Sequence, residues 1–100
     1  MSAEPEPVTI DWYVYLLLCA DGSYYTGITT DPKRRLLEHN ENNKKAAKYT
    51  RARRPVKMVF FELCESRSEA SSREYEIRKL SRVKKKALID SMDDSLPKST

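Results

Sequence analysis

The stretch from residue 12 to residue 30, WYVYLLLCADGSYYTGITT, constrains the fold more than any other part of the chain. Residues 13–18 are almost entirely β-branched, aromatic or leucine, which is typical of a strand buried on both faces. Asp21-Gly22 predicts a turn, because glycine adopts positive φ without a Cβ clash. Residues 23–28 again favour a strand, so the stretch predicts a β-hairpin.

The length of the turn decides which side chains share a face of this hairpin. A two-residue loop would pair Tyr15 with Ile28 and place Tyr15 and Tyr25 on opposite faces, since side chains alternate along a strand. A three-residue loop, with Gly22 in the left-handed position, would pair Tyr15 with Gly27 and bring both tyrosines to one face. We favour the three-residue loop, in part because it lets both tyrosines serve one site.

Basic residues are unevenly distributed along the 100-residue chain, whose net charge is only +4. Residues 33–57 carry ten basic and two acidic side chains, and residues 79–86 add five basic and no acidic ones. Such clustering is typical of a protein that binds a phosphate backbone, and solvated lysine-rich faces are the alternative explanation. The candidate nucleic-acid-binding residues are Lys33, Arg34, Lys48, Arg51, Arg53, Arg54 and Lys57.

The cysteines and the apolar runs indicate the cellular compartment. Cys19 and Cys64 lack the spacing of metal ligands, which predicts buried, reduced thiols. The acidic, proline-containing start is not a signal peptide, and the longest apolar run is too short to cross a bilayer. We therefore expect a cytoplasmic protein with no membrane partner.

Helix and strand signals continue after the hairpin. Asp31-Pro32 predicts the start of a helix to about residue 40, with Leu36 and Leu37 as its apolar stripe. Residues 56–63 predict a third strand. A capping box, Ser66-x-x-Glu69, opens a helix to about residue 80. Residues 82–91 predict a last helix, whose inner face would carry Val83, Ala87 and Leu88.

The resulting order, ββαβαα, predicts an α+β fold: a small three-stranded antiparallel sheet flanked by helices. We expect one domain over residues 10–92, preceded by a disordered tail at residues 1–9 and followed by a frayed tail at residues 93–100.

The sequence lacks the usual catalytic pairs. It has one histidine, no glycine-rich phosphate loop and no paired histidine or cysteine ligands. Two tyrosines, an arginine, a histidine and a glutamate remain, and these suit phosphodiester hydrolysis. That reaction needs a base for the attacking water, positive charge for the phosphorus centre and help for the leaving oxygen.

Several short motifs share the order and spacing of a known family. Tyr13-Val14-Tyr15 and Tyr25-Thr26-Gly27 flank the turn, Arg35 lies eight residues past Gly27, His39 lies four further on, and Arg73-Glu74 falls in the helix after the third strand. The chain resembles a GIY-YIG domain over residues 12 to 90, and most resembles the small stand-alone bacterial proteins of the YhbQ type. It departs from the family pattern at Tyr13, where a glycine is expected, and at Thr26.

The resemblance implies a role for each matched residue. Tyr15 and Tyr25 would divide two tasks, activation of the water and contact with the scissile phosphate, and Gly27 would be structural. Arg35 would stabilise the transition state, and His39 would assist a tyrosine. Glu74 would be the carboxylate ligand of one Mg²⁺ (or Mn²⁺) ion. Each residue also has a purely structural explanation. Tyrosines in strands often pack in the core, His39 could cap the end of its helix, and Glu74 could form an ion pair with Arg78 at i,i+4.

Together with the resemblance, these residues predict a metal-dependent endonuclease that hydrolyses phosphodiester bonds of DNA with weak sequence specificity, and the resemblance suggests a link to DNA repair. The alternatives are a non-catalytic nucleic-acid-binding module and a protein-interaction adaptor. The sequence leaves open RNA as the substrate, the identity of the base (either tyrosine or a metal-bound water), the physiological metal and the oligomeric state, for which a monomer is favoured.

Overall fold

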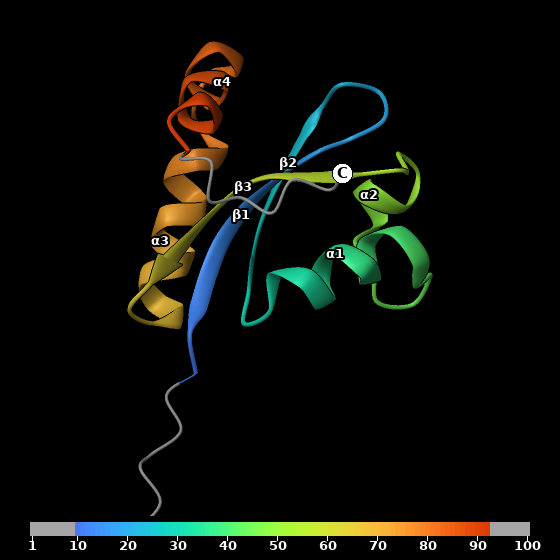
Figure 1. Ribbon diagram of the computed structural model, residues 1–100, viewed down its shortest axis with the longest axis horizontal. Helices are drawn as coiled ribbons and strands as arrows, with labels where there is room; N and C mark the ends of the chain where they lie inside the picture. Colours follow the sequence, from blue (N-terminus) through green and yellow to red (C-terminus); the bar gives the residue numbers. More distant parts are fainter. Residues whose placement is uncertain (1–9, 93–100) are drawn as a thin grey trace, which may run out of the picture.

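The chain folds as a three-stranded antiparallel sheet with helices on both faces, which confirms the predicted α+β class (Figure 1). The computed structural model describes residues 10–92, and both predicted tails lie outside the described residues. The elements are, in order, β1 (Trp12–Leu18), β2 (Tyr24–Thr29), α1 (Pro32–Glu41), α2 (Lys48–Arg51), β3 (Lys57–Cys64), α3 (Arg67–Arg78) and α4 (Arg82–Asp90). Within the described residues, no helix is long and apolar enough to cross a membrane.

The hairpin between β1 and β2 has the predicted three-residue loop. Tyr15 pairs with Gly27, and Leu17 pairs with Tyr25. The Cys19 N–H donates to the Ser23 carbonyl at 2.8 Å, and Gly22 has a φ of 84°. Tyr15 and Tyr25 therefore lie on the same face of the sheet.

Gly27 is required by the approach of Tyr15 from across the strand pair. A Cβ atom at this position would lie 2.6 Å from Tyr15 Cζ, closer than carbon atoms can pack. The absence of a side chain at Gly27 thus leaves room for the hydroxyl end of the Tyr15 ring.

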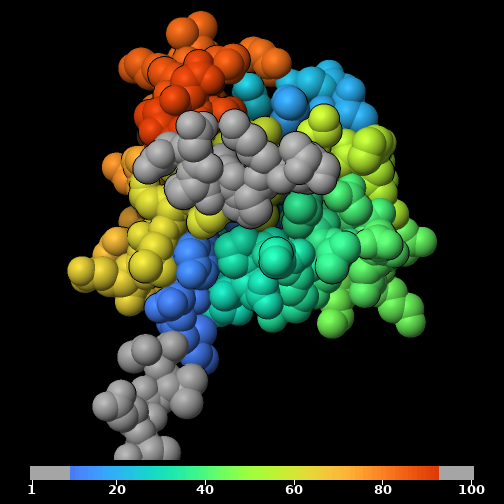
Figure 2. All heavy atoms as spheres, in the orientation of Figure 1, coloured from blue at the N-terminus to red at the C-terminus, as the bar shows by residue number. Residues whose placement is uncertain are grey.

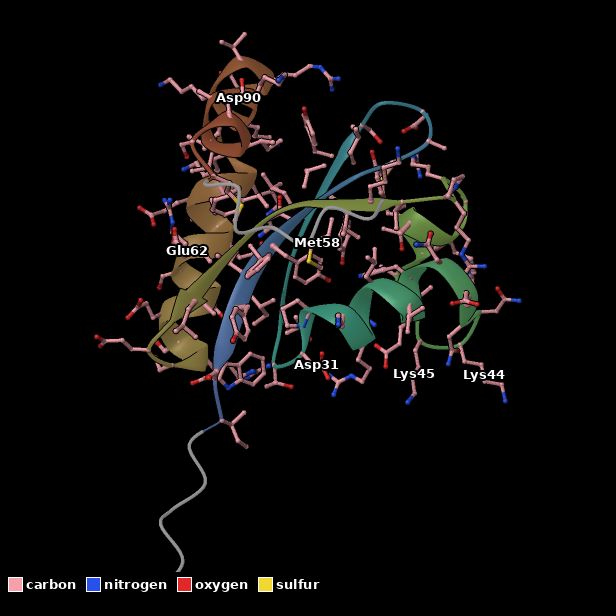
Figure 3. The ribbon with its side chains drawn as sticks, viewed as in Figure 1. Asp31, Lys44, Lys45, Met58, Glu62 and Asp90 are labelled. Atoms are coloured by element: carbon pink, nitrogen blue, oxygen red, sulfur yellow. The ribbon has the colours of Figure 1, made fainter. Side chains whose placement is uncertain are left out.

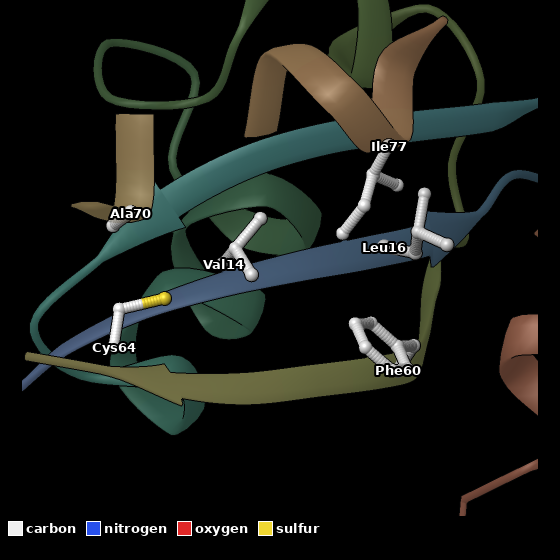
Figure 4. Packing of buried hydrophobic residues seen from close by; sticks show 6 residues of the cluster. All are labelled: Val14, Leu16, Phe60, Cys64, Ala70 and Ile77. Carbon is white, nitrogen blue, oxygen red and sulfur yellow. The ribbon is translucent and has the colours of Figure 1, made fainter. Parts of the chain in front are cut away.

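The central strand β1 is buried on both faces, as predicted, because the sheet order is β2-β1-β3. On one face, β1 packs toward α3 in the cluster that Figure 4 shows, formed by Val14, Leu16, Phe60, Cys64, Ala70 and Ile77. On the other face, Tyr15 and Leu17 pack with Cys19 and Val56 on the side that α1 covers. Both cysteines are buried and free, which confirms the predicted thiols.

Helix α1 begins as predicted, but its buried side differs from the prediction. Asp31 accepts the Arg34 N–H at 3.1 Å and caps the helix. Leu36 packs against the Tyr15 cluster, whereas Leu37 is 58% exposed, so its assignment to the buried stripe was wrong. The sheet-facing side runs through Leu36, His39 and Asn40, which share a face at i, i+3 and i+4. Polar side chains occupy the positions where apolar ones were expected.

The second helical layer also shows one correction. Ser66 caps α3 by accepting the Glu69 N–H at 3.1 Å, as predicted. In α4, Val83 is 79% exposed, so its placement on the inner face was wrong. Leu88 packs against the core as predicted, together with Ile89, because the last turn of α4 is the part that reaches the core.

Candidate active site

The predicted site residues meet at the edge of the sheet formed by β2. Helix α1 approaches this edge from one face and α3 from the other (Figure 1). An open pocket of about 500 Å³ lies there, lined by Tyr15, Tyr24, Tyr25, Thr26, Gly27, Ile28, Arg35, Tyr49, Glu74, Arg78 and Lys85. Five of the predicted residues thus share one concave wall.

His39 lies directly behind the pocket, in a buried chain of three polar side chains. The Tyr15 hydroxyl is 2.8 Å from His39 Nε2, and His39 Nδ1 is 2.7 Å from Thr50 Oγ1. The Thr50 hydroxyl donates in turn to the Ala47 carbonyl at 3.0 Å. Since Tyr15, His39 and Thr50 are at most 1% exposed, these bonds do not compete with bulk water.

Burial sets the protonation states of this chain. It raises the pKa of Tyr15 to about 12, and the neighbouring guanidinium of Arg35 opposes that rise only in part. Burial also lowers the pKa of His39 from 6.5 to about 4, with a further contribution from the charge of Arg35. At neutral pH, Tyr15 is therefore a phenol and His39 a neutral imidazole.

We expect the protein to become less stable as the pH decreases, because of His39. The unfolded chain has the ordinary histidine pKa of 6.5 and binds a proton before the folded protein does, at about 4. The contribution of neutral His39 is complete above pH 6.5 and is lost as the pH falls toward 4. Between pH 7.5 and 4.5 the loss is roughly 2 to 3 kcal/mol, at ~1.4 kcal/mol per pKa unit. Urea unfolding at both pH values measures it.

The matched control for this measurement is His39→Gln. Glu38, whose pKa the hydrogen bond from Arg35 lowers, titrates in both proteins and cancels in the comparison. Arg35 and Arg54, the other charged groups that act on His39, are present in both proteins. An equal loss of stability in wild type and His39→Gln would contradict the buried, neutral state of His39.

Tyr25 belongs to an aromatic group beside this chain. Its ring lies edge-on to His39, with centroids 5.3 Å apart, and stacks on Tyr49 at 6.0 Å and an interplanar angle of 26°. The Arg53 guanidinium lies 3.7 Å from the centroid of the Tyr49 ring. Tyr49 is 37% exposed and also lines the pocket.

Arg35 brings positive charge to the pocket from α1. Its Nη1 atom donates to Glu38 Oε1 at 3.0 Å and to the Lys45 carbonyl at 2.7 Å, which fixes the guanidinium in place. Among the described residues no hydrogen bond engages its Nη2. A fixed guanidinium with free N–H donors suits an anionic oxygen in the pocket.

Glu74 reaches the same pocket from α3. Its Oε2 atom lies 3.3 Å from Arg78 Nη2, so the alternative i,i+4 ion pair does form. The geometry is not that of a hydrogen bond, however, and within residues 10–92 this buried oxygen has no hydrogen-bond partner. Its side chain is only 19% exposed. A carboxylate oxygen without a hydrogen bond, on a residue that lines the pocket, is a suitable ligand for a hard divalent cation.

No group of three or more histidine, cysteine, aspartate or glutamate side chains in the described part of the chain could enclose a metal ion. An ion at Glu74 would therefore take most of its ligands from water and substrate oxygens. Mg²⁺ commonly binds in this way, through one or two carboxylates and phosphate oxygens. The residues present fit one Mg²⁺ or Mn²⁺ ion.

The other predicted nucleic-acid-binding residues lie outside the pocket, and their role stays a prediction. Lys33, Lys48 and Lys57 are exposed. The segment that follows α1, in green, forms one side of the surface in Figure 2. Lys44 and Lys45 also project outward there (Figure 3). The four arginines make internal contacts: Arg34 with Glu38, Arg51 with the Asn43 carbonyl, Arg53 with Asp21, and Arg54 with the His39 carbonyl.

Three residues of this region received no functional role from the sequence. Arg78 and Lys85 add positive charge to the pocket wall, and the basic run at residues 79–86 was the signal that pointed toward Lys85. Thr50 is fully buried against His39, and no pattern in the sequence indicated this contact.

Residues 11–87 match the model of the GIY-YIG catalytic domain. The chain belongs to the GIY-YIG family. As the sequence suggested, this GIY-YIG protein is similar to small proteins of the family. It is 53% identical over 85 residues to UPF0213 protein DP2720 of Desulfotalea psychrophila, covering 85% of this chain and 76% of the relative. It is also 53% identical over 77 residues to UPF0213 protein VNG_2274C of Halobacterium salinarum, covering 77% of this chain and 97% of that relative.

Two solved structures share the fold of this GIY-YIG protein. Protein EF2693 of E. faecalis is 49% identical, with a TM-score of 0.54. UPF0213 protein BH0048 of Bacillus halodurans is 48% identical, with a TM-score of 0.50. Both similarities cover 80% of this chain and 83% of the other. The family is one of nucleases, so its members point to a nucleic-acid substrate.

Proposed function

We propose that this protein is a metal-dependent endonuclease that hydrolyses phosphodiester bonds of DNA. The observation that supports the proposal most is the pocket at the β2 edge, which collects Tyr15, Tyr25, Arg35 and Glu74. These side chains come from four elements, β1, β2, α1 and α3, and a purely structural role would not require them to converge.

Arg35 and Tyr25 would hold the scissile phosphate. The Arg35 guanidinium, fixed by Glu38 and the Lys45 carbonyl, would donate to phosphate oxygens and offset the charge that develops at phosphorus. The Tyr25 hydroxyl would donate to a further phosphate oxygen from the same wall. Phosphate contacts do not distinguish bases, which supports weak sequence specificity.

Tyr15 and His39 would move the proton of the attacking water. The pKa of about 12 means that Tyr15 carries no phenolate at neutral pH, so it must lose its proton as it gains one. The water proton would pass to Tyr15 Oη while the Tyr15 proton passes to His39 Nε2, 2.8 Å away. Bound phosphate would favour this transfer, because it offsets the Arg35 charge that lowers the pKa of His39. The leaving 3′-oxygen takes a proton from solvent.

Glu74 would hold one Mg²⁺ or Mn²⁺ ion through its unsatisfied Oε2 atom. When bound, the ion supplies positive charge that stabilises the leaving oxygen. The Arg78 side chain, which lies 3.3 Å from this oxygen, would move aside or turn toward a substrate phosphate.

A cleavage assay tests the proposal. Purified protein is incubated with single-stranded, duplex and branched DNA, each with Mg²⁺, Mn²⁺ or EDTA. We expect products with either metal and none with EDTA. We further propose that the protein acts as a cytoplasmic monomer in DNA repair, which predicts that branched DNA is cut faster than intact duplex. Absence of product on every DNA substrate with both metals would refute the endonuclease, and the same assay on RNA tests the remaining substrate class.

The second candidate is a non-catalytic nucleic-acid-binding module. Exposed lysines on α1, α2 and β3 favour it, because they present charge to a phosphate backbone without needing the pocket. This candidate predicts DNA binding that weakens steeply with salt, and no product with either metal. Neither binding nor cleavage is expected of the third candidate, a protein-interaction adaptor.

A further inference from the structure

Thr50 is the residue with the least evident reason for its place. It lies in α2, a helix of four residues in the connection between α1 and β3, and is completely buried. Its hydroxyl has two polar neighbours, His39 Nδ1 at 2.7 Å and the Ala47 carbonyl at 3.0 Å. A buried hydroxyl has one proton to donate, so these two contacts determine where the protons lie in the hydrogen bonds that join Thr50, His39 and Tyr15.

The Ala47 carbonyl fixes the direction of the Thr50 hydroxyl. A carbonyl oxygen carries no proton, and two oxygens 3.0 Å apart attract each other only when a hydrogen lies between them. The Thr50 proton therefore points to Ala47, and its lone pair faces His39. His39 Nδ1 must then carry a proton and donate it to Thr50.

The tautomer of His39 follows directly. A neutral imidazole has one N–H, and if this is at Nδ1, the lone pair of Nε2 faces the Tyr15 hydroxyl. Tyr15 then donates its proton to His39 and keeps its own lone pairs free. In the other tautomer, Nε2–H would occupy a Tyr15 lone pair, and the Tyr15 proton would have to point elsewhere.

We propose that Thr50 is a positioning residue that holds His39 in the Nδ1–H tautomer, so that Tyr15 presents lone pairs rather than a proton to the pocket. The kinetic part of this inference rests on the proposed nuclease function, because only a Tyr15 that can accept a proton assists the attacking water. The structural part, the tautomer itself, does not depend on any activity.

Nitrogen NMR of the imidazole tests the tautomer directly. The chain has a single histidine, so its two ¹⁵N signals in a long-range ¹H–¹⁵N spectrum belong to His39. At pH 7 we expect Nδ1 in the range of a protonated ring nitrogen and Nε2 in the range of an unprotonated one. The reverse assignment in the wild-type protein, or an equal mixture, would overturn the proposal even if no variant folds.

Two variants test the role of the hydroxyl. Thr50→Val keeps the shape of the side chain and removes the hydroxyl, so we expect His39 to change to the Nε2–H tautomer. Thr50→Ser keeps the hydroxyl and retains Nδ1–H. An Nδ1–H signal that persists in Thr50→Val would show that another group sets the tautomer and would overturn the proposal.

The kinetic consequence is a loss of turnover rather than of binding. By analogy with residues that orient a histidine ligand, we expect Thr50→Val to lower kcat by about 10- to 100-fold with KM nearly unchanged. Thr50→Ser is expected to restore the wild-type rate. A Thr50→Val variant that has changed tautomer and still turns over at the wild-type rate would refute the kinetic role. If wild type cleaves nothing, the proposed function fails, while the tautomer measurement still decides the structural part.

Discussion

Replacement of Glu74 by glutamine is expected to abolish metal-dependent cleavage of DNA. Glutamine has nearly the same shape but no negative charge, so Mg²⁺ or Mn²⁺ loses its protein ligand. The fold is expected to survive, because glutamine fills the same space and the ion-pair partner that it leaves, Arg78, is 61% exposed to water. Cleavage of a supercoiled plasmid measures the activity, and circular dichroism with thermal unfolding checks the fold.

The matched control is Glu76→Gln on the same helix. Glu76 is an acidic residue whose side chain is 65% exposed, and it forms an ion pair with Arg73 at 3.8 Å, away from the pocket. We expect this variant to cleave DNA at the wild-type rate. If Glu74→Gln and Glu76→Gln have equal activity, Glu74 does not hold the catalytic ion.

Arg35→Ala is expected to lower the cleavage rate by on the order of 10²- to 10³-fold, the usual cost of losing one group that stabilises transition-state charge. The loss is expected in kcat, because the charge on the phosphate increases as the water attacks. The rate constant for single-turnover cleavage at saturating protein measures this effect without contributions from product release. Arg35→Lys keeps the charge but not the planar pair of donors, so its cleavage rate is expected to lie between those of the wild type and Arg35→Ala.

Arg34→Ala is the control for Arg35→Ala. Arg34 lies next to it on α1 and also forms an ion pair with Glu38, at 3.5 Å, but it does not line the pocket. Removal of Arg34 is expected to weaken DNA binding in low salt and to leave the single-turnover rate unchanged. Equal losses of rate in both variants would assign Arg35 to general charge attraction rather than to catalysis.

Arg35→Ala also has an expected effect that requires no substrate. Because the charge of Arg35 contributes to the low pKa of His39, its removal is expected to raise that pKa above the wild-type value of about 4. An NMR titration of the single histidine measures the change. An unchanged His39 pKa in Arg35→Ala would show that the guanidinium lies too far from His39 to influence its protonation.

The local sequence predicted the elements that depend on local signals. The Asp31-Pro32 start of α1, the Ser66 cap of α3 and the Gly22 turn rest on backbone chemistry within a few residues, and all three are present. The common face of Tyr15 and Tyr25 was harder to predict, because both turn lengths suit Asp21-Gly22. The contact of Tyr15 with Gly27 in the three-residue register explains the outcome.

The details that were missed depend on long-range packing. Leu37 and Val83 follow a helical apolar pattern but are exposed, because the sheet covers a different side of each helix. Thr50 contacts His39 across 11 residues, and no periodicity or spacing predicts such a contact. Glu74 was pointed to only by the resemblance to the family, because its place in the pocket depends on α3 lying beside the edge strand β2.

The central claim is that a divalent ion and a phosphate meet at the β2 edge, between Glu74 and Arg35. Line broadening by Mn²⁺ in a backbone NMR spectrum tests it most directly, because the paramagnetic ion weakens the signals of nearby amides. We expect substoichiometric Mn²⁺ to broaden Glu74 and residues 25–27 first, and to leave these signals sharp in Glu74→Gln. Broadening centred on Glu38 and Glu41, or identical broadening in wild type and variant, would contradict the account.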